Sequence, residues 1–541
     1  MFQTAQAQSG AVAGGFRRRS SRRPGPAAAV ASARKPKDAW DAQNQAKMAA
    51  LVAGWTGDEQ ELYQKLNQLR DAERAQMEKR GLVDKQDVRK RLDDAIVFTG
   101  SCMDMCPVFE RVRRQYENNV ASYERDGSGR IAAGLAVKAF SRPAAGQPPP
   151  LPSDVRPPGV LQATLSYLVD HILPKLPEAH TFLWDRTRSV RQDFTYQNYF
   201  GPEAVDCNER IVRVHIVTLH VLAGSDLQYS RQQELEQLNK ALQTLSEVYA
   251  DVRKKGGQSP NEAEFQAYRL LSHLRDADLE RQIQTLPRHV FLDPQVQLAL
   301  ELRALAQQNN VVERGYVNTE NAPNMFARFF RLVADARVPF LFAALLETHF
   351  NDIRMWALRS MSAGYHRRGK PYVAAQLYPM LGCDDEAELL ELCRYWQVAV
   401  KESDGAMCVD VTSFSVQSAQ AKPPVRQAFS RTLVDAKRGD VPVQDLVNGN
   451  NLAVYPQNAN DFAHTMEGLF PMPKDAAAGV LVRQGCRRGR LSGQTRVWQG
   501  RAQERLAVWQ AAVGVWHAGG VAVRHPVRVA VRQAAGGVAV R

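Results

Sequence analysis

The sequence predicts an all-α protein: a helical-repeat (TPR-like) array that ends in a winged helix and is flanked by disordered basic tails. Three observations lead to this fold class. Apolar residues recur at alternating steps of three and four between residues 160 and 350, as on the buried faces of amphipathic helices. Residues 351–415 show the pattern of three helices followed by a β-hairpin. Both ends of the chain are rich in Arg and poor in acidic residues.

The bulk composition is that of an ordinary folded protein. The 541 residues are 44% hydrophobic and 23% charged, which is usual for globular chains. No apolar stretch is long enough for a membrane helix, and the basic N-terminus lacks the apolar run of a secretory signal. We therefore expect a soluble intracellular protein without membrane insertion. The seven cysteines are an odd number spread over a long chain, which indicates free thiols in a reducing compartment.

The formal net charge of +13 comes from the two ends of the chain. Residues 1–40 hold eight Lys or Arg against one acid, and residues 481–541 hold eleven Arg against one acid. The chain between them is therefore mildly acidic, so a nucleic-acid contact there requires a local basic patch. The basic clusters at 17–23 and 34–37 are typical of sequences bound by nuclear import receptors, with a solvated tail as the alternative.

Composition and pattern divide the chain into several segments. We predict a disordered basic region at 1–57, a helical segment at 58–141, a Pro-rich linker at 142–158, the helical array at 159–350, the winged helix at 351–415, an irregular, partly helical extension at 416–480 and a low-complexity basic tail at 481–541. The tail repeats GGVAVR without a helical period, which favours disorder or an out-of-frame terminal exon. We assign it no function.

The helices are predicted from the spacing of apolar residues. Leu161, Leu165, Leu168 and Ile172 mark the first helix of the array, which Pro174 ends. Further helices are expected at 178–200, 209–222, 235–252, 265–274, 294–307, 323–335 and 339–349. Each helix has one apolar stripe to bury, and stacked antiparallel pairs achieve this. Before the array, the composition of residues 58–97 favours an exposed helix.

Residues 351–415 predict a winged helix. Helices are expected at 351–365 and 371–381, and Asp384 or Asp385 can cap a third helix. The next residues alternate in polarity on both sides of Ser403-Asp404-Gly405, which predicts a two-stranded hairpin.

The segment GSCMDMCPVFER (100–111) holds the most unusual local pattern. Cys102 and Cys106 lie four apart, but structural zinc sites usually add a second Cys or His pair nearby, and the next Cys is Cys207. A redox pair usually has two intervening residues rather than three. We therefore expect buried structural thiols, with a zinc site as the alternative.

The same segment predicts the start of a helix. Pro107 fits the first helical position, with Cys106 as the cap, and Glu110 then lies near the positive end of the helix. The segment is thus interpreted as a packed loop that enters a helix.

Three arginines in WDRTRSVRQDF are a second candidate site. Arg186, Arg188 and Arg191 can hold phosphates, yet Asp185 and Asp193 lie at helical pairing distance and nearly balance them. We favour structural pairing.

The remaining motifs give no sign of catalysis. His215 and His220 are interpreted as histidines with hydrogen-bond partners between helices, because no Ser, Cys or Asp lies at a telling spacing. The sequence has no Gly-rich phosphate loop, metal-ligand cluster or nucleophile motif. We therefore expect a non-enzymatic protein without a cofactor.

A basic run in the predicted winged helix is the candidate nucleic-acid site. Its members are Arg354, Arg359, His366, Arg367, Arg368 and Lys370. The third helix of the unit presents Asp385, Glu386, Glu388 and Glu391, which phosphates would repel, and this argues against base reading. Sequence-tolerant contacts to the nucleic-acid backbone through Arg354, Arg359, Arg367, Arg368 and Lys370 are the hypothesis, with a solvated loop as the alternative.

Three ordered blocks resemble one known family. The segment 100–111, with Cys102, Met105, Cys106, Pro107, Glu110 and Arg111, resembles the first motif of the suppressor-of-actin/GANP family of nuclear mRNA-export scaffolds. FLWDRTRSVRQDF, which contains Arg186, Arg188 and Arg191, and NERIVRVHIVTLH resemble its next two blocks, and NMFARFFRLV and the winged helix complete the likeness. The resemblance covers about residues 60–415.

This resemblance implies a PCI-type module in the second transcription-export complex (TREX-two) at the nuclear pore. The module would pair with a second PCI-domain subunit through adjoining winged helices, a small acidic DSS-type peptide would support that partner, and the joint surface would bind RNA or single-stranded nucleic acid. Nuclear-pore components and centrin are further partners that the family implies. The implied location is the nucleus.

The sequence departs from the family in two places, and alternatives stay open. Phe-Gly repeats are absent from the N-terminal region, and the long centrin-binding helix is not recognisable in the C-terminal region. Short family members act at centrosomes or in splicing. A structural subunit of the proteasome-lid or signalosome type is another alternative.

Overall fold

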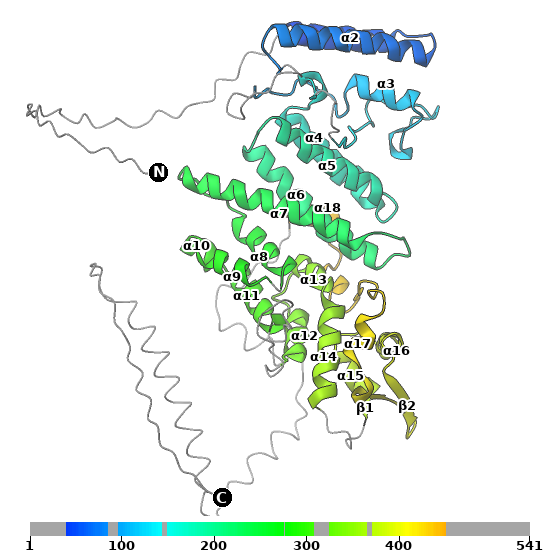
Figure 1. Ribbon diagram of the computed structural model, residues 1–541, viewed down its shortest axis with the longest axis vertical. Helices are drawn as coiled ribbons and strands as arrows, with labels where there is room; N and C mark the ends of the chain where they lie inside the picture. The colour runs from blue at the N-terminus through cyan, green and yellow to red at the C-terminus, as the bar shows by residue number, and fades with distance from the viewer. Residues whose placement is uncertain are drawn as a thin grey trace, which may run out of the picture. The chain divides into compact units, whose positions relative to one another are not determined.

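Helices make up most of the chain that the computed structural model describes, as the sequence predicts (Figure 1). The described residues are 39–84, 96–142, 149–274, 276–307, 324–364 and 371–450. The predicted basic tail and the two predicted import clusters lie outside these residues. Within the described ranges, no helix is both long enough and apolar enough to cross a membrane.

The described N-terminal part contains the α-helices α1 (Ala39–Ala53), α2 (Glu59–Lys79) and α3 (Val108–Tyr116). Asp58 begins α2, because its carboxylate accepts a hydrogen bond from the Gln60 backbone N–H. The prediction of disorder up to residue 57 is wrong for α1. Met48 of this helix is buried in a small apolar cluster with Leu62 and Val112. This packing stabilises α1, although its Ala- and Gln-rich sequence does not indicate a buried face.

The helical array follows. Its elements are α4 (Pro158–Tyr167), α5 (His180–Tyr196), α6 (Pro202–Ala223), α7 (Arg231–Lys254), α8 (Glu262–Ser272), α9 (Ala277–Gln284), α10 (Arg288–Phe291), α11 (Pro294–Gln307), α12 (Phe326–Ala334) and α13 (Phe340–Glu347). Helix α6 contacts α4, α5, α7 and α13, while α8 packs on α7 and α11. Helices α9 and α10 are missing from the prediction, because 8 and 4 residues hold too few apolar repeats to reveal a period.

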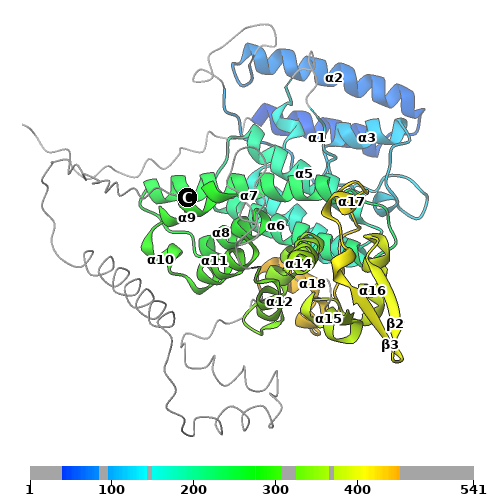
Figure 2. The ribbon, with the colours of Figure 1, turned by 60° about the horizontal axis from the view of Figure 1, so that its bottom comes forward.

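The predicted winged helix has its own core and a small sheet (Figure 2). Its elements are α14 (Phe350–Gly364), β1 (Tyr372–Val373), α15 (Ala374–Met380), α16 (Glu386–Tyr395), β2 (Ala399–Ser403) and β3 (Ala406–Asp410). The antiparallel sheet has the order β1-β3-β2. Asp404 and Gly405 have φ values of 53° and 75°, which suit the predicted hairpin turn. Asp385 caps α16 by accepting a hydrogen bond from the Glu388 N–H at 2.8 Å.

The extension after the winged helix returns to the array. It contains α17 (Val416–Gln420) and α18 (Val443–Asn448), and its residues 451–480 lie outside the described part. Helix α18 packs on α6, with Val447 fully buried. Glu347 of α13 accepts a hydrogen bond from the Ser430 N–H at 2.7 Å. The array and the winged helix are therefore joined twice, once by chain continuity and once by this returning segment.

The predicted Pro-rich linker is in part interior structure. Leu151, Val155 and Arg156 are fully buried, so residues 149–158 do not form a solvent-exposed linker. The prediction of a linker was based on proline content alone. It did not anticipate that the residues between the prolines are buried.

Candidate functional site

The motif loop at 100–106 lies against the buried part of the Pro-rich segment. The backbone N–H groups of Ser101 and Cys102 donate to the carbonyls of Pro152 and Val155 at 2.8 and 3.1 Å. A Cβ atom at Gly100 would lie 2.3 Å from the Val155 carbonyl oxygen, closer than any real contact. The motif glycine is therefore needed because two backbone segments approach each other closely.

Both motif thiols are interior groups, as the sequence predicts. Cys102 is 3% exposed and Cys106 is 0% exposed. Burial raises the pKa of Cys102 to about 12 and that of Cys106 well above its usual value, so both stay protonated and unreactive. Across the described ranges, no group of three or more His, Cys, Asp or Glu side chains is placed to hold a metal ion.

The other motif residues fix the loop to its surroundings. The Met105 carbonyl accepts hydrogen bonds from the Lys138 N–H at 3.0 Å and from Arg156 Nη1 at 3.2 Å. Arg111 Nη1 donates to Asp104 Oδ2 at 2.8 Å and to the Cys106 carbonyl at 2.9 Å. Each of these bonds holds the loop in one conformation.

The helix after the loop starts one residue later than predicted. Pro107 takes the cap position and α3 begins at Val108, so Cys106 is not the cap. Glu110 lies in the first turn, as expected, and its Oε1 accepts a hydrogen bond from the Ala139 N–H at 2.7 Å. The helix is therefore tied to the chain around residue 139 rather than capped by its own side chain.

Behind the loop lies a buried ion cluster around Asp193 of α5. Lys138 Nζ lies 2.6 Å from Asp193 Oδ1, and Arg156 Nε lies 2.8 Å from Oδ2. Arg156 Nη2 also donates to Ser189 Oγ at 2.8 Å. All four side chains are buried. We call residues 100–111, 136–139, 149–156 and 185–197 the motif joint, because this cluster connects the four segments.

The three arginines of α5 have different roles. Arg186 pairs with Asp185 and with buried Glu124, at 3.1 Å for the second pair, so its predicted structural pairing is confirmed. Arg188 lies over two aromatic rings, 3.8 Å from the centroid of Phe140. These contacts make both arginines part of the packing.

The prediction that Asp193 balances its helix neighbours is wrong. It pairs across the chain with Lys138 and Arg156 instead. Arg191 is left with a hydrogen bond of 3.5 Å to the Gln237 carbonyl, and burial lowers its pKa to about 10.

The two histidines of α6 have partners, as predicted. His215 Nδ1 lies 2.6 Å from Glu234 Oε1 of α7, and His220 Nδ1 lies 2.8 Å from Glu347 Oε2 of α13. Burial acts to raise the pKa of Glu234, but the nearby His215 and His180 outweigh it and hold that pKa at about 2. The histidines therefore join helices of the array.

The structure removes Arg354 from the predicted nucleic-acid patch. This side chain is fully buried. Its Nε donates to the Leu381 carbonyl at 3.0 Å, and its Nη1 lies 2.9 Å from Glu388 Oε1. Arg354 donates hydrogen bonds to carbonyls at the end of α15. Because its side chain is buried there, no phosphate can reach it. The spacing of the basic residues does not indicate that one of them points inward.

The other members of the patch lie at or beyond the end of α14. Arg359 is half-buried, with its guanidinium 5.1 Å from the centroid of the Trp356 ring. Arg367, Arg368 and Lys370 lie outside the described residues.

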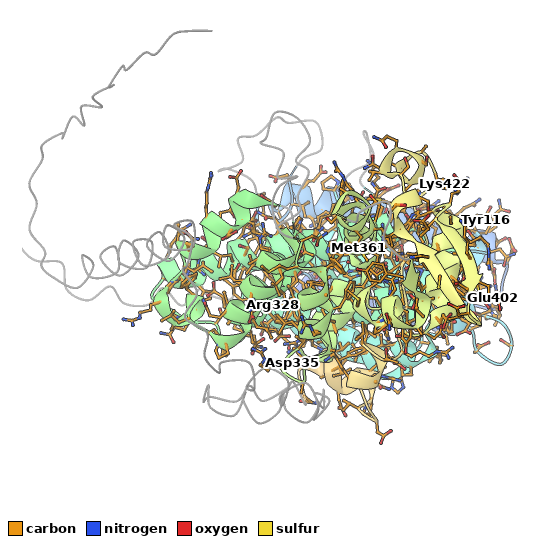
Figure 3. All side chains as sticks on the ribbon, turned by 90° about the horizontal axis from the view of Figure 1, so that it is seen from below. Tyr116, Arg328, Asp335, Met361, Glu402 and Lys422 are labelled. Atoms are coloured by element: carbon orange, nitrogen blue, oxygen red, sulfur yellow. The ribbon has the colours of Figure 1, made fainter. Side chains whose placement is uncertain are left out.

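The surface of the winged helix is acidic on α16. Asp385 and Glu391 are exposed, and Glu386 is half-exposed. Glu388 is engaged with Arg354 and with the Asp384 N–H, at 2.7 Å for the second contact. Next to α16, β2 pairs with β3 alone, so its outer edge is open within the described sheet. Glu402 lies on this strand (Figure 3).

Comparison with known proteins identifies the family of this chain. Residues 105–402 match the sequence profile of the SAC3/GANP family. The Schizosaccharomyces pombe protein SAC3 family protein 1 is 44% identical over 397 residues, which cover 72% of this chain and 38% of that protein. Drosophila melanogaster Protein xmas is 32% identical, and Arabidopsis thaliana SAC3 family protein B is 30% identical. Each alignment covers 56% of this chain, but only 15% and 18% of those two relatives.

Proposed function

Since the chain belongs to the SAC3/GANP family, we propose that it is a non-enzymatic scaffold subunit of a nuclear mRNA-export complex of the TREX-two type. In this role it works at the nuclear pore, and it pairs with a second PCI-domain subunit whose fold a small acidic DSS-type peptide supports. The pair binds the backbone of RNA or single-stranded nucleic acid. The chain spans 38% of the Schizosaccharomyces pombe relative, so these activities are proposals for the shared part.

The observation that carries the proposal is the surface of the winged helix. The helix that would enter a DNA groove, α16, begins with acidic side chains, and phosphates repel such a surface. A protein partner with a basic face fits it. The open edge of β2 adds unpaired backbone groups beside this face, which a strand of the partner can complete.

Nucleic acid then contacts the chain elsewhere, at the end of α14. We assign this contact to Arg359 and to the basic residues Arg367, Arg368 and Lys370. Such contacts neutralise phosphates without reading bases, so binding falls steeply with salt and tolerates changes of sequence.

The partner surface is tested by co-expressing the tagged full chain with candidate PCI-domain subunits. We expect the double variant Glu386→Lys/Glu391→Lys to lose the partner while its melting temperature is unchanged. The control is Glu236→Lys/Glu247→Lys on the exposed side of α7, which makes the same change of charge. Loss of the partner in both variants, or in neither, contradicts the assignment to α16. Recovery of proteasome-lid or signalosome subunits instead would support the structural alternative.

The nucleic-acid contact is tested with the assembled pair. Charge reversal at Arg367, Arg368 and Lys370 should weaken binding of single-stranded RNA and flatten its salt dependence. Unchanged affinity would remove these residues from the site.

A further inference from the structure

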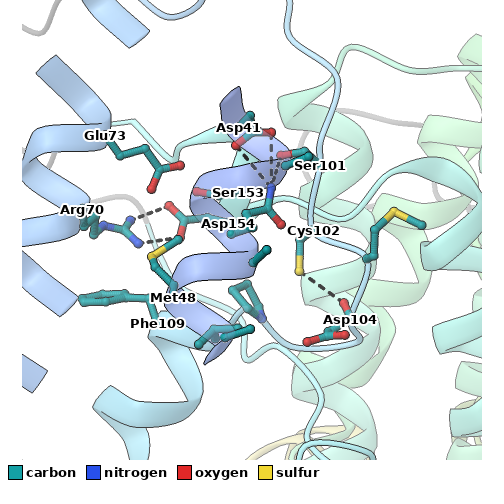
Figure 4. Close-up of a pocket in the computed structure, with 17 residues that line it drawn as sticks. Asp41, Met48, Arg70, Glu73, Ser101, Cys102, Asp104, Phe109, Ser153 and Asp154 are labelled. Atoms are coloured by element: carbon teal, nitrogen blue, oxygen red, sulfur yellow. Dashed lines mark hydrogen bonds and ion pairs between the residues drawn. The ribbon is translucent and has the colours of Figure 1, made fainter. Parts of the chain in front are cut away.

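A cavity of about 300 Å³ lies where α1 and α2 meet the motif loop (Figure 4). It lies in the N-terminal part of the fold, away in sequence from the winged helix. Its polar lining comes from Asp41 and Gln45 of α1, Arg70 and Glu73 of α2, and the loop residues Ser101, Asp104, Ser153 and Asp154. None of the roles described above uses this cavity.

The lining holds more negative charge than it can balance. It has four carboxylates and one guanidinium. Arg70 forms a two-pronged pair with Asp154, and Asp104 pairs with Arg111. These two pairs leave Asp41 and Glu73 without an ion pair among the residues that the structure describes.

Glu73 is the deepest of these groups. Its side chain is 1% exposed, and its Oε1 has no hydrogen-bond partner within the described structure. Burial raises its pKa to about 7, with the Ser153 hydroxyl offsetting part of this. A buried carboxylate without a cation is costly. Asp41 is also buried, and the Gln45 amide donates to both of its carboxylate oxygens at 3.2 Å. Within the described residues, Arg70 is the cation of the lining and is paired with Asp154, so Asp41 and Glu73 have no ion-pair partner of their own.

The opposite wall of the cavity is apolar. Met48, Val108 and Phe109 line it, with the Arg70 guanidinium 4.3 Å from the centroid of the Phe109 ring. Figure 4 shows Met48 and Phe109 on the side away from Glu73 and Asp41. A hydrated metal ion would gain nothing from this wall. A ligand with a cationic head and an apolar stem matches both halves.

We propose that this cavity receives a lysine or arginine side chain of a partner protein, whose charged head meets Glu73 and Asp41 while its stem packs on Met48 and Phe109. The inference does not depend on the function proposed for the winged helix, and it adds a second docking point near the N-terminal end of the fold.

The test uses the full chain and two small probes. N-acetyl-arginine amide carries the charge, and N-acetyl-citrulline amide has nearly the same shape without it. Binding is followed by NMR through the methyl groups of Met48 and Met103, which line the cavity. We expect a saturable shift with the arginine probe and none with the citrulline probe. Equal shifts with both probes, or no saturable shift with either, overturn the proposal.

Matched variants locate the binding. Glu73→Gln and Asp41→Asn should each weaken the arginine probe by about tenfold, since each removes one charge contact in a buried site. Glu61→Gln, an exposed position on the same helix, should have no effect. Both cavity variants remove a buried charge and should fold, which the melting temperature checks. Unchanged binding in both would place the probe elsewhere and refute the proposal.

Discussion

The motif joint and the winged helix hold together in different ways. In the motif joint, buried ion pairs connect the segments, with Asp193 paired to Lys138 and Arg156. The core of the winged helix is apolar, with Leu377 and Leu389 fully buried, and Arg354 is its fully buried charged residue. Polar partners demand particular residues at particular places, whereas an apolar core accepts many residues of similar size. The motif joint therefore leaves a recognisable motif, although its residues serve the fold.

The largest expected effect comes from breaking the ion cluster of the joint. Asp193→Asn leaves Lys138 and Arg156 buried without a full counter-charge and should cost about 3–5 kcal/mol of unfolding free energy. Chemical denaturation measures it. Asp170→Asn, at an exposed position, should change stability by less than about 0.5 kcal/mol. A cost for Asp193→Asn as small as that of the control would show that the cluster does not hold the joint.

The matching change in the winged helix is Arg354→Ala. It removes the hydrogen bonds to the Leu381 and Gly382 carbonyls and should destabilise this unit by about 3 kcal/mol. Hydrogen exchange of α15 and α16 amides reports the loss locally. If Arg354→Ala instead weakened RNA binding with exchange unchanged, the residue would be a ligand and not a support.

The edge of the joint has its own pH dependence through Glu73. The pKa of Glu73 in the folded chain is about 7, above the ordinary 4.5, because burial favours the protonated form. Its contribution to the free energy of unfolding is therefore fully present below pH 4.5 and is lost as the pH rises through 7. The shift corresponds to about 3 kcal/mol. The free energy of unfolding of Glu73→Gln, relative to that of the natural chain, should therefore be larger at pH 8 than at pH 5. An equal stability difference at both pH values would contradict the burial of an unpaired carboxylate.

A smaller effect tests the close approach of the two backbone segments. Gly100→Ala places a Cβ against the Val155 carbonyl and should cost about 2 kcal/mol as the segments separate. Gly134→Ala, where nothing lies within 4 Å of the new atom, is the control. Equal thermal stability of the two variants would mean that the segments are not in contact.

The smallest effect separates packing from metal binding at Cys106. Cys106→Ala should cost about 1 kcal/mol and Cys106→Ser more, because the hydroxyl is buried without a partner. EDTA should leave the melting temperature of the natural chain unchanged. Zinc in the purified protein, lost together with stability on chelation, would restore the zinc alternative.

The sequence predicts the two regions unequally well. The array was predictable because each long helix repeats its apolar positions several times, as α7 and α11 do. The hairpin was predictable from Ser403-Asp404-Gly405, whose turn chemistry is local. The pairing of Asp193 with Arg156 was not, because it joins a helix to a Pro-rich segment that looked like a linker.

The candidate site shows the same limit. The burial of Cys102 and Cys106 followed from the missing second pair of metal ligands. The burial of Arg354 did not follow, because a sequence does not say which member of a basic cluster faces the interior. Helix α1 was missed for a related reason, since the apolar surface it packs on belongs to α2 and α3.

The central claim is that the motif joint maintains the fold while α16 holds the partner. The most direct test is the amount of PCI-domain partner recovered per folded chain, compared between Asp193→Asn and Glu386→Lys/Glu391→Lys. We predict that the joint variant melts at a lower temperature yet recovers the partner normally below that temperature, whereas the α16 variant melts normally and recovers none. Normal recovery by the α16 variant, together with loss of the partner by a folded joint variant, would contradict the claim.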